Sequence, residues 1–155
     1  MSPRVVEQSS DVAAPIDAVW TRVVSPEGIN DEMRPWLTMS MPRGTEELTI
    51  DTVPLGQPLG RAWIRLFGIV PIDYDHLSIA ALVPGRSFHE KSTMLSMKAW
   101  QHERTLTEVS DGLTRVHDRI AFEPRLLMRL SAGLFAKVFA AFFAHRHRRL
   151  ARHFS

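Results

Sequence analysis

The chain has 155 residues, of which 45% are hydrophobic and 23% charged, and its formal net charge is +2 with neutral histidines. These values are near the average for soluble globular proteins, so they exclude a disordered chain, and the length predicts one domain over residues 1–155. The absence of cysteine excludes disulfides and thiol chemistry, and the first residues lack the apolar run of a signal peptide, so we expect a cytoplasmic protein.

The first part of the chain predicts one strand and two short helices. Residues 5–12 have β-branched ends and alternating polar positions, which is typical of a strand. Pro15 then opens a helix whose apolar residues recur at helical spacing. These residues are Ile16, Val19, Trp20 and Val23. Ser25 is a typical N-cap for a second helix, which should end near Pro35 because proline disfavours helix in the residue before it.

Period-two segments separated by proline and glycine fill the middle of the chain and predict a meander of antiparallel strands. The predicted strands are 48–53, 60–67, 72–83, 86–94, 99–109 and 113–123. The first of these is predicted somewhere between Glu46 and Val53. Tight turns are expected at Gly85 and Gly112, because glycine supplies the positive φ that such turns require.

The last segment predicts a long helix over about 126–153, because it contains one glycine and no proline. Between Leu134 and Ala144 only Lys137 is charged, so we expect the helix to be buried on most sides. Arg129 and Lys137 interrupt the apolar run, which argues against a transmembrane helix.

Four arginines crowd the end of this predicted helix: Arg146, Arg148, Arg149 and Arg152. The simplest interpretation is that the cations meet the negative pole of the helix dipole and extend into water. The alternative is contact with an anionic membrane or with nucleic acid. The sequence contains no nucleic-acid-binding motif, so we expect no nucleic-acid partner.

Several motifs resemble those of the START and birch-pollen-allergen superfamily, also called SRPBCC. Two segments resemble the N-terminal part of the family's sequences. They are Ala14-Pro-Ile-Asp-Ala-Val-Trp20 and Ser25-Pro-Glu-Gly28. The family's bacterial polyketide cyclase and ligand-binding branch resembles Phe88-His-Glu90, Trp100-Gln-His102-Glu-Arg104, Asp111-Gly-Leu-Thr114 and Asp118-Arg-Ile-Ala-Phe122-Glu-Pro124. The resemblance covers essentially the whole chain.

This resemblance implies an α+β helix-grip fold. In that fold a curved antiparallel sheet of about six to seven strands wraps around a long C-terminal helix, with residues 4–12 as an edge strand. The space between sheet and helix is then a cavity for a small hydrophobic molecule.

Strand alternation directs several polar side chains inward. Asp118 shares a face with Val116, while His102 and Arg104 share one with Trp100. The turn between the two strands sets Arg104 opposite or diagonal to Asp118, so the pair can satisfy two charges that would be costly alone. The alternative is that His102, Arg104 and Asp118 line the cavity and bind a carboxylate or carbonyl of the ligand.

The expected ligand-binding residues are the aromatic and polar side chains that face the predicted cavity. They are Trp36, Trp63, Phe88, Glu90, Trp100, His102, Arg104, Asp118, Phe122, Phe135, Phe139 and Phe142. Core packing is the simplest role for the tryptophans and for the phenylalanine stripe of the last helix, although that helix also forms one wall of the cavity. Glu90 can join either polar network.

No cofactor or metal is expected. Asp73 and Asp75 face one side of their strand and His76 the other, which argues against a shared metal site. The sequence contains no P-loop, dinucleotide fingerprint, zinc-protease motif or nucleophile elbow.

We therefore predict noncatalytic binding or carriage of a small hydrophobic molecule such as a lipid, an isoprenoid or an aromatic polyketide-like compound. The first alternative is an enzyme of the polyketide cyclase or aromatase type, with His102 as acid or base, Arg104 orienting a carbonyl and Asp118 holding either side chain. The second is a peripheral membrane or interaction module that uses the basic helix end.

Overall fold

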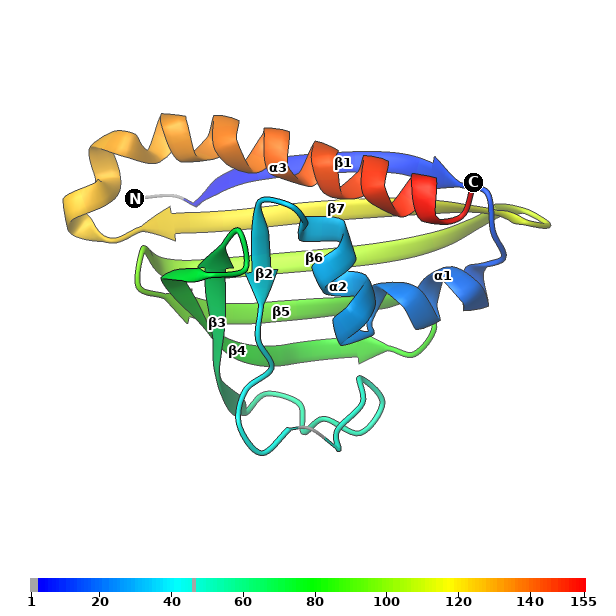
Figure 1. Ribbon diagram of the computed structural model, residues 1–155, viewed down its shortest axis with the longest axis horizontal. Coiled ribbons are helices and arrows are strands. Elements are labelled where there is room, and N and C mark those ends of the chain that lie inside the picture. Colours follow the sequence, from blue (N-terminus) through cyan, green and yellow to red (C-terminus); the bar gives the residue numbers. More distant parts are fainter. Residues whose placement is uncertain (1–2, 46) are drawn as a thin grey trace.

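A curved antiparallel sheet wraps around a long C-terminal helix in the computed structural model, which describes residues 3–45 and 47–155 (Figure 1). Its seven strands follow the order β1-β7-β6-β5-β4-β3-β2. The strands are β1 Arg4–Val12, β2 Leu37–Met39, β3 Pro58–Leu66, β4 Val70–Val83, β5 Ser87–Met94, β6 Met97–Ser110 and β7 Leu113–Pro124. The helices are α1 Ile16–Val23, α2 Pro26–Met33, the 3-10 helix η1 Leu126–Ser131 and α3 Ala132–His153. The predicted helix-grip architecture is confirmed, including β1 as an edge strand beside β7.

The β6–β7 hairpin carries the most complete register of the sheet. Arg104 lies directly opposite Asp118, and Gly112 has the positive φ of 75° that the turn requires. Alternate residues of β6 are buried on the concave face, as the period-two pattern predicts. The hairpin therefore delivers its polar side chains to the interior.

The strand predicted at 48–53 is wrong. Thr49 and Thr52 instead close a turn, in which the Thr49 amide donates to the Thr52 hydroxyl at 2.8 Å. Such local bonds compete with strand pairing. Glu46, where the prediction began, lies outside the described residues. The short strand β2, which the sequence did not indicate, occupies the sheet edge beside β3.

The two short helices are confirmed and close one end of the sheet. The apolar residues of α1 are buried together with Leu150 of α3. At the start of α2 the Gly28 amide donates to the Ser25 hydroxyl at 3.0 Å, which is the expected N-cap. Because α2 packs on α3, it covers the second half of that helix.

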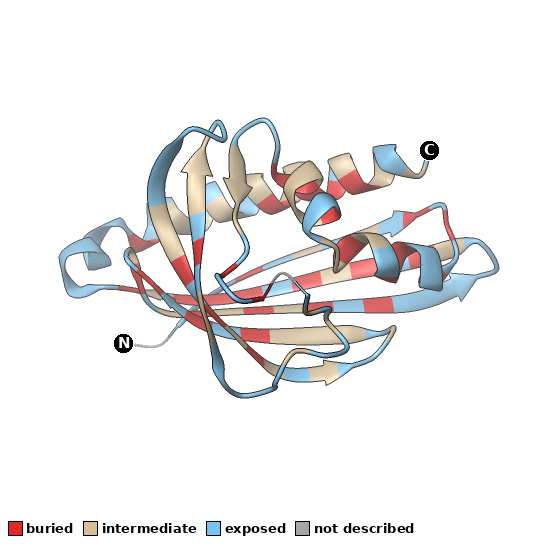
Figure 2. Ribbon diagram, turned by 60° about the horizontal axis from the view of Figure 1, so that its bottom comes forward, coloured by how far each residue is buried: buried red, intermediate tan, exposed pale blue. Residues whose placement is uncertain are grey.

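Helix α3 is not buried on most sides, which corrects the sequence interpretation. Its first half is largely exposed, with Leu134 at 64% and Val138 at 52%, whereas Phe143 and Leu150 in the second half are almost fully buried (Figure 2). The physical reason is that α3 packs mainly on the edge strand β1 and on α2, so one face is covered. The described helical segment Leu126–His153 is also long and apolar enough to cross a membrane by length and composition.

Candidate functional site

A buried ion network is centred on Asp118. Arg104 donates to both carboxylate oxygens, from Nε at 2.8 Å and from a terminal nitrogen at 2.7 Å. His102 Nε2 and His147 Nε2 each donate at 2.7 Å, one to each oxygen. Four donors use the four lone-pair sites of a carboxylate, so Asp118 has no acceptor capacity left for a ligand.

Glu32 of α2 links this network to an arginine of the sheet and to an arginine of α3. It accepts from Arg104 at 2.9 Å and from Arg146 Nε at 3.2 Å, and all three side chains are buried. The neighbouring Asp31 accepts from Arg149 at 2.9 Å. We call Glu32, His102, Arg104, Asp118, Arg146 and His147 the ion network. It joins the sheet, α2 and α3 at one point.

In the simplest interpretation all four arginines of the basic helix end extend into water. The structure shows that this is true of only some of them. Arg146 is 8% exposed and paired with Glu32, because α2 brings a carboxylate against this face of α3. Arg149 is paired with Asp31, whereas Arg148 and Arg152 are exposed. The predicted membrane contact through these arginines stays a prediction.

The electrostatics of the ion network follow from burial and pairing. Burial alone would raise the pKa of Asp118, but the Arg104 guanidinium holds this pKa well below its usual range. Burial lowers the pKa of His102, and this effect outweighs the opposing effect of Asp118. His102 is consequently a neutral donor near pH 7, and Arg104 with Asp118 is a fully charged pair.

A second polar group lies further along the concave face. We call Asp75, Glu90, Ser92 and Trp100 the carboxyl cluster. All four side chains are buried, and Trp100 Nε1 donates to Glu90 at 2.9 Å. Among the described residues, no hydrogen bond of good geometry reaches Asp75 Oδ1 or Ser92 Oγ, although the Asp75 carboxyl interacts with the side chains of Ser92 and Glu90.

The carboxyl cluster has the opposite electrostatic character. Burial, followed by the repulsion of the Asp75 carboxylate, raises the pKa of Glu90 well above its usual range. Burial also raises the pKa of Asp75. Two carboxyl groups without a direct cationic partner therefore favour a state in which Glu90 keeps its proton and can act as a donor.

Aromatic rings from α3 cover the carboxyl cluster. The Phe139 ring lies 5.2 Å from that of Trp100 and 4.9 Å from that of Phe122, and Phe135 stacks on it at 5.8 Å. Phe135, Phe139 and Phe142 face the sheet as predicted, but each is only partly buried. The rings fill this space without being sealed in it.

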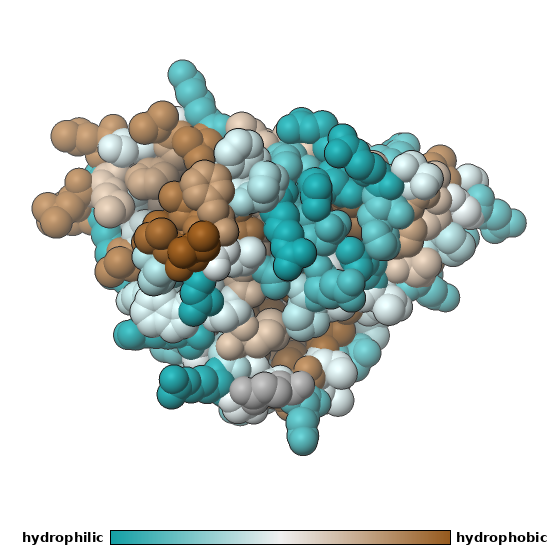
Figure 3. Space-filling view, viewed as in Figure 1, coloured by the Kyte–Doolittle hydropathy of each residue, from teal (hydrophilic) through white to brown (hydrophobic). Residues whose placement is uncertain are grey.

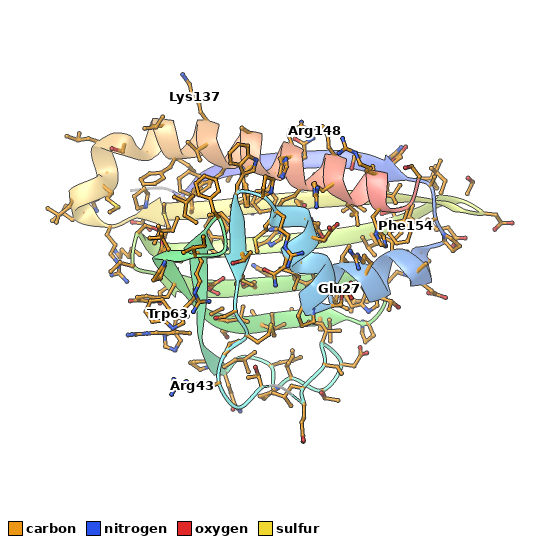
Figure 4. The ribbon with its side chains drawn as sticks, viewed as in Figure 1. Glu27, Arg43, Trp63, Lys137, Arg148 and Phe154 are labelled. Atoms are coloured by element: carbon orange, nitrogen blue, oxygen red, sulfur yellow. The ribbon has the colours of Figure 1, made fainter. Side chains whose placement is uncertain are left out.

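Two of the predicted tryptophans do not lie in the core. Trp63 is 39% exposed and packs on Tyr74 on the outer face, because its neighbour Ala62 takes the inward position (Figure 4). Trp36 is 50% exposed and lies between Phe67 and His145. The remaining predicted site residues all face the interior. They are Phe88, Glu90, Trp100, His102, Arg104, Asp118, Phe122, Phe135, Phe139 and Phe142.

Two pockets open at the surface, and the lining of the second includes Ser92 and Trp100 of the carboxyl cluster. One of about 570 Å³ lies between Arg34 at the end of α2, β2 and the β3–β4 turn at Phe67. The other, of about 340 Å³, lies on the sheet near Lys91 and Gln101. In the described part of the chain no group of three or more histidine or acidic side chains is arranged to hold a metal ion.

Sequence reasoning missed Glu32, His147 and Ser10 as members of the interior. Ser10 on β1 lies 2.5 Å from His147 Nδ1, which completes the contacts of that imidazole. Glu32 lies four residues after Gly28 and next to Met33, and all three are buried, so the pattern of a buried helix face was present but weak. Asp75 was considered only as a metal ligand.

One family model matches the chain, over residues 10–154. It describes a domain of unknown function, DUF8410. The chain belongs to this family. No curated protein matches the chain.

Solved structures establish the fold at low sequence identity. A START superfamily protein from Mycobacterium smegmatis has a TM-score of 0.72 at 10% identity, over 97% of this chain and 96% of that one. Protein CV1439 from Chromobacterium violaceum has a TM-score of 0.69 at 13% identity, over 97% and 96%. The Zhui aromatase/cyclase from Streptomyces sp. R1128 has a TM-score of 0.61 at 18% identity, over 97% and 90%. The predicted START-like, SRPBCC helix-grip fold is thus confirmed.

Proposed function

We propose that this protein binds a small, largely apolar molecule carrying one hydrogen-bonding group, between the sheet and the first half of α3. The observation that carries the proposal is a pair of buried polar atoms that no well-aligned hydrogen bond satisfies within the described chain, Asp75 Oδ1 and Ser92 Oγ. A buried polar atom without a partner costs about 1–3 kcal/mol, so a ligand that pairs with it recovers that free energy.

The surroundings of these atoms suit such a ligand. Trp100, Phe122 and Phe139 supply an apolar wall beside the carboxyl cluster, the combination typical of small-molecule sites. The ligand would displace the partly buried rings of Phe135 and Phe139 rather than enter an empty space. A lipid, an isoprenoid or an aromatic polyketide-like compound with a hydroxyl or amine would meet these requirements.

The test is a displacement titration with an uncharged apolar fluorophore and two competitors, a long-chain alcohol and the alkane of equal length. We expect the alcohol to compete at one equivalent per chain and to bind at least about tenfold more tightly than the alkane. Asp75→Leu, which removes the acceptor, should weaken the alcohol selectively, while Asp51→Leu, at an exposed position, should change neither. Failure of the fluorophore and both competitors to bind would refute the proposal.

A cyclase-like activity is the second candidate, favoured by the raised pKa of Glu90. A carboxylic acid whose pKa is raised by burial, next to an aromatic wall, can protonate a ligand carbonyl as a general acid. Incubation with a linear poly-β-ketone should then yield a cyclised product by mass spectrometry, and Glu90→Gln should abolish it. The roles predicted for His102, Arg104 and Asp118 remain predictions, because these groups already satisfy one another.

A further inference from the structure

A set of exposed apolar side chains lies at one end of the molecule. We call Leu126, Leu127, Leu130, Leu134, Phe67 and Ile69 the apolar tip. Leu127 is 97% exposed, Leu130 is 104% and Ile69 is 77%. On the face drawn in Figure 3, apolar side chains gather at the left, over η1, the start of α3 and the β3–β4 turn. None of these residues belongs to the described core clusters, so stability does not explain them.

The charges that η1 and the first half of α3 place around the apolar tip are all positive, while the flanking Glu123 and Asp73 are partly buried. From Pro124 to the end of the chain there is no Asp or Glu, while Arg125, Arg129 and Lys137 are exposed. Lys137 points away from the domain (Figure 4). The β3–β4 turn from 66 to 72 contains no charged residue at all. Apolar side chains whose neighbouring exposed charges are cations are complementary to an anionic lipid surface, where the apolar groups enter the interface and the cations meet the headgroups.

We propose that the apolar tip docks this protein on an anionic lipid bilayer. Leu127, Leu130 and Ile69 enter the interface, and Arg129 and Lys137 contact the headgroups. A second copy of the chain is a poorer occupant, because a two-fold contact through this surface would set its cations against themselves. The proposal does not depend on a ligand in the interior.

The proposal assigns binding to the opposite end of α3 from the basic cluster at its C-terminus. Arg146 and Arg149 of that cluster are already paired with acidic residues of α2. If the apolar tip binds the membrane, variants of the tip lose binding. If the basic cluster binds it, variants of that cluster lose binding, so one experiment distinguishes the two sites.

The test is flotation of the full chain with phosphatidylcholine vesicles, with and without phosphatidylglycerol. We expect recovery only with the anionic lipid. The double change Leu127→Ser with Leu130→Ser should weaken binding about tenfold, because each leucine contributes part of its burial free energy. Arg129→Gln should weaken it several-fold. The matched control is Arg148→Gln with Arg152→Gln, which should bind like the parent.

Three results would overturn the proposal. The first is equal flotation of the parent and the leucine variant. The second is loss of binding in the Arg148 and Arg152 control alone, which would assign the membrane contact to the basic helix end. The third is a parent protein that does not bind vesicles but is a dimer by light scattering, if the Leu130→Ser variant is a monomer. Thermal melting of each variant checks the fold, and since Leu127 and Leu130 are fully exposed no loss of stability is expected.

Discussion

The interior contains two groups of buried ionisable side chains that differ in how they are paired. In the ion network, Asp118 accepts four hydrogen bonds and Glu32 joins two arginines. In the carboxyl cluster, Asp75 and Glu90 have a single indole donor, and two polar atoms make no well-aligned hydrogen bond within the described chain. A saturated group connects layers of the fold, whereas an unsaturated one has capacity left for another molecule.

The two halves of helix α3 differ in a similar manner, since one half packs beside the ion network and the other beside the carboxyl cluster. Its second half packs Phe143 and Leu150 into the core, under α2. Its first half places partly buried rings over the carboxyl cluster and leaves Leu134 exposed. Stability should therefore depend mainly on the ion network and the second half of α3, and binding on the carboxyl cluster and the first half.

The largest expected effect is the loss of the central carboxylate. Asp118→Ala leaves Arg104 buried without its main partner and should lower the free energy of unfolding by about 3–5 kcal/mol in urea titrations. The matched control is Asp11→Ala, which removes an exposed pair with Arg115 and should cost about 1 kcal/mol or less. Equal losses would mean that the ion network does not stabilise the fold.

Two phenylalanines on α3 compare its halves directly. Phe143→Ala empties a position that is 2% exposed and should lower the free energy of unfolding by about 3–5 kcal/mol. Phe135→Ala, at a partly buried position, should cost about 1 kcal/mol, since most of that ring is not enclosed. A larger loss for Phe135 would contradict the division of α3 and imply a sealed interior.

The pH dependence of stability should also differ between the two groups. The folded-state pKa of Glu90 is raised above its usual value of 4.5, so the folded chain keeps a proton that the unfolded chain releases. Stability should consequently fall as pH rises above that value, by up to about 1.4 kcal/mol per pH unit, until the folded pKa is reached.

Asp118 has the opposite sign, since its lowered pKa stabilises the fold above pH 3.8 and this stabilisation is lost in acid. Thermal melting from pH 4 to pH 8 should show a flatter profile for Glu90→Gln than for the parent. An unchanged slope in that variant would show that Glu90 ionises normally.

The smallest expected effect separates the buried Ser92 from the partly buried Ser10. Ser92→Ala removes a hydroxyl that makes no well-aligned hydrogen bond and should leave the free energy of unfolding unchanged or raise it by up to about 1 kcal/mol. Ser10→Ala removes the hydroxyl next to His147 and should lower it by about 1 kcal/mol. Chemical unfolding of both variants checks the comparison, which a destabilised Ser92→Ala would contradict.

Local pattern was enough to predict most of the fold and one pair of the interior. Period-two alternation and the turn at Gly112 predicted Arg104 opposite or diagonal to Asp118, because hairpin register follows from turn position, and the two residues lie directly opposite. The same alternation separated Asp75 from His76. Proline and capping signals placed α1 and α2, and the long segment with one glycine and no proline placed the last helix.

Tertiary structure alone decided which of these elements meet. Glu32 contacts Arg104 and Arg146 across 72 and 114 residues of sequence, and no local pattern encodes the docking of α2 on the sheet. The extent to which α3 is buried could not be predicted either. An apolar helix can be surrounded by other elements on all sides or covered on one face only, as β1 and α2 cover α3. Hydrophobic periodicity specifies which side chains of an element share a face, whereas the long-range packing of the layers specifies what that face touches.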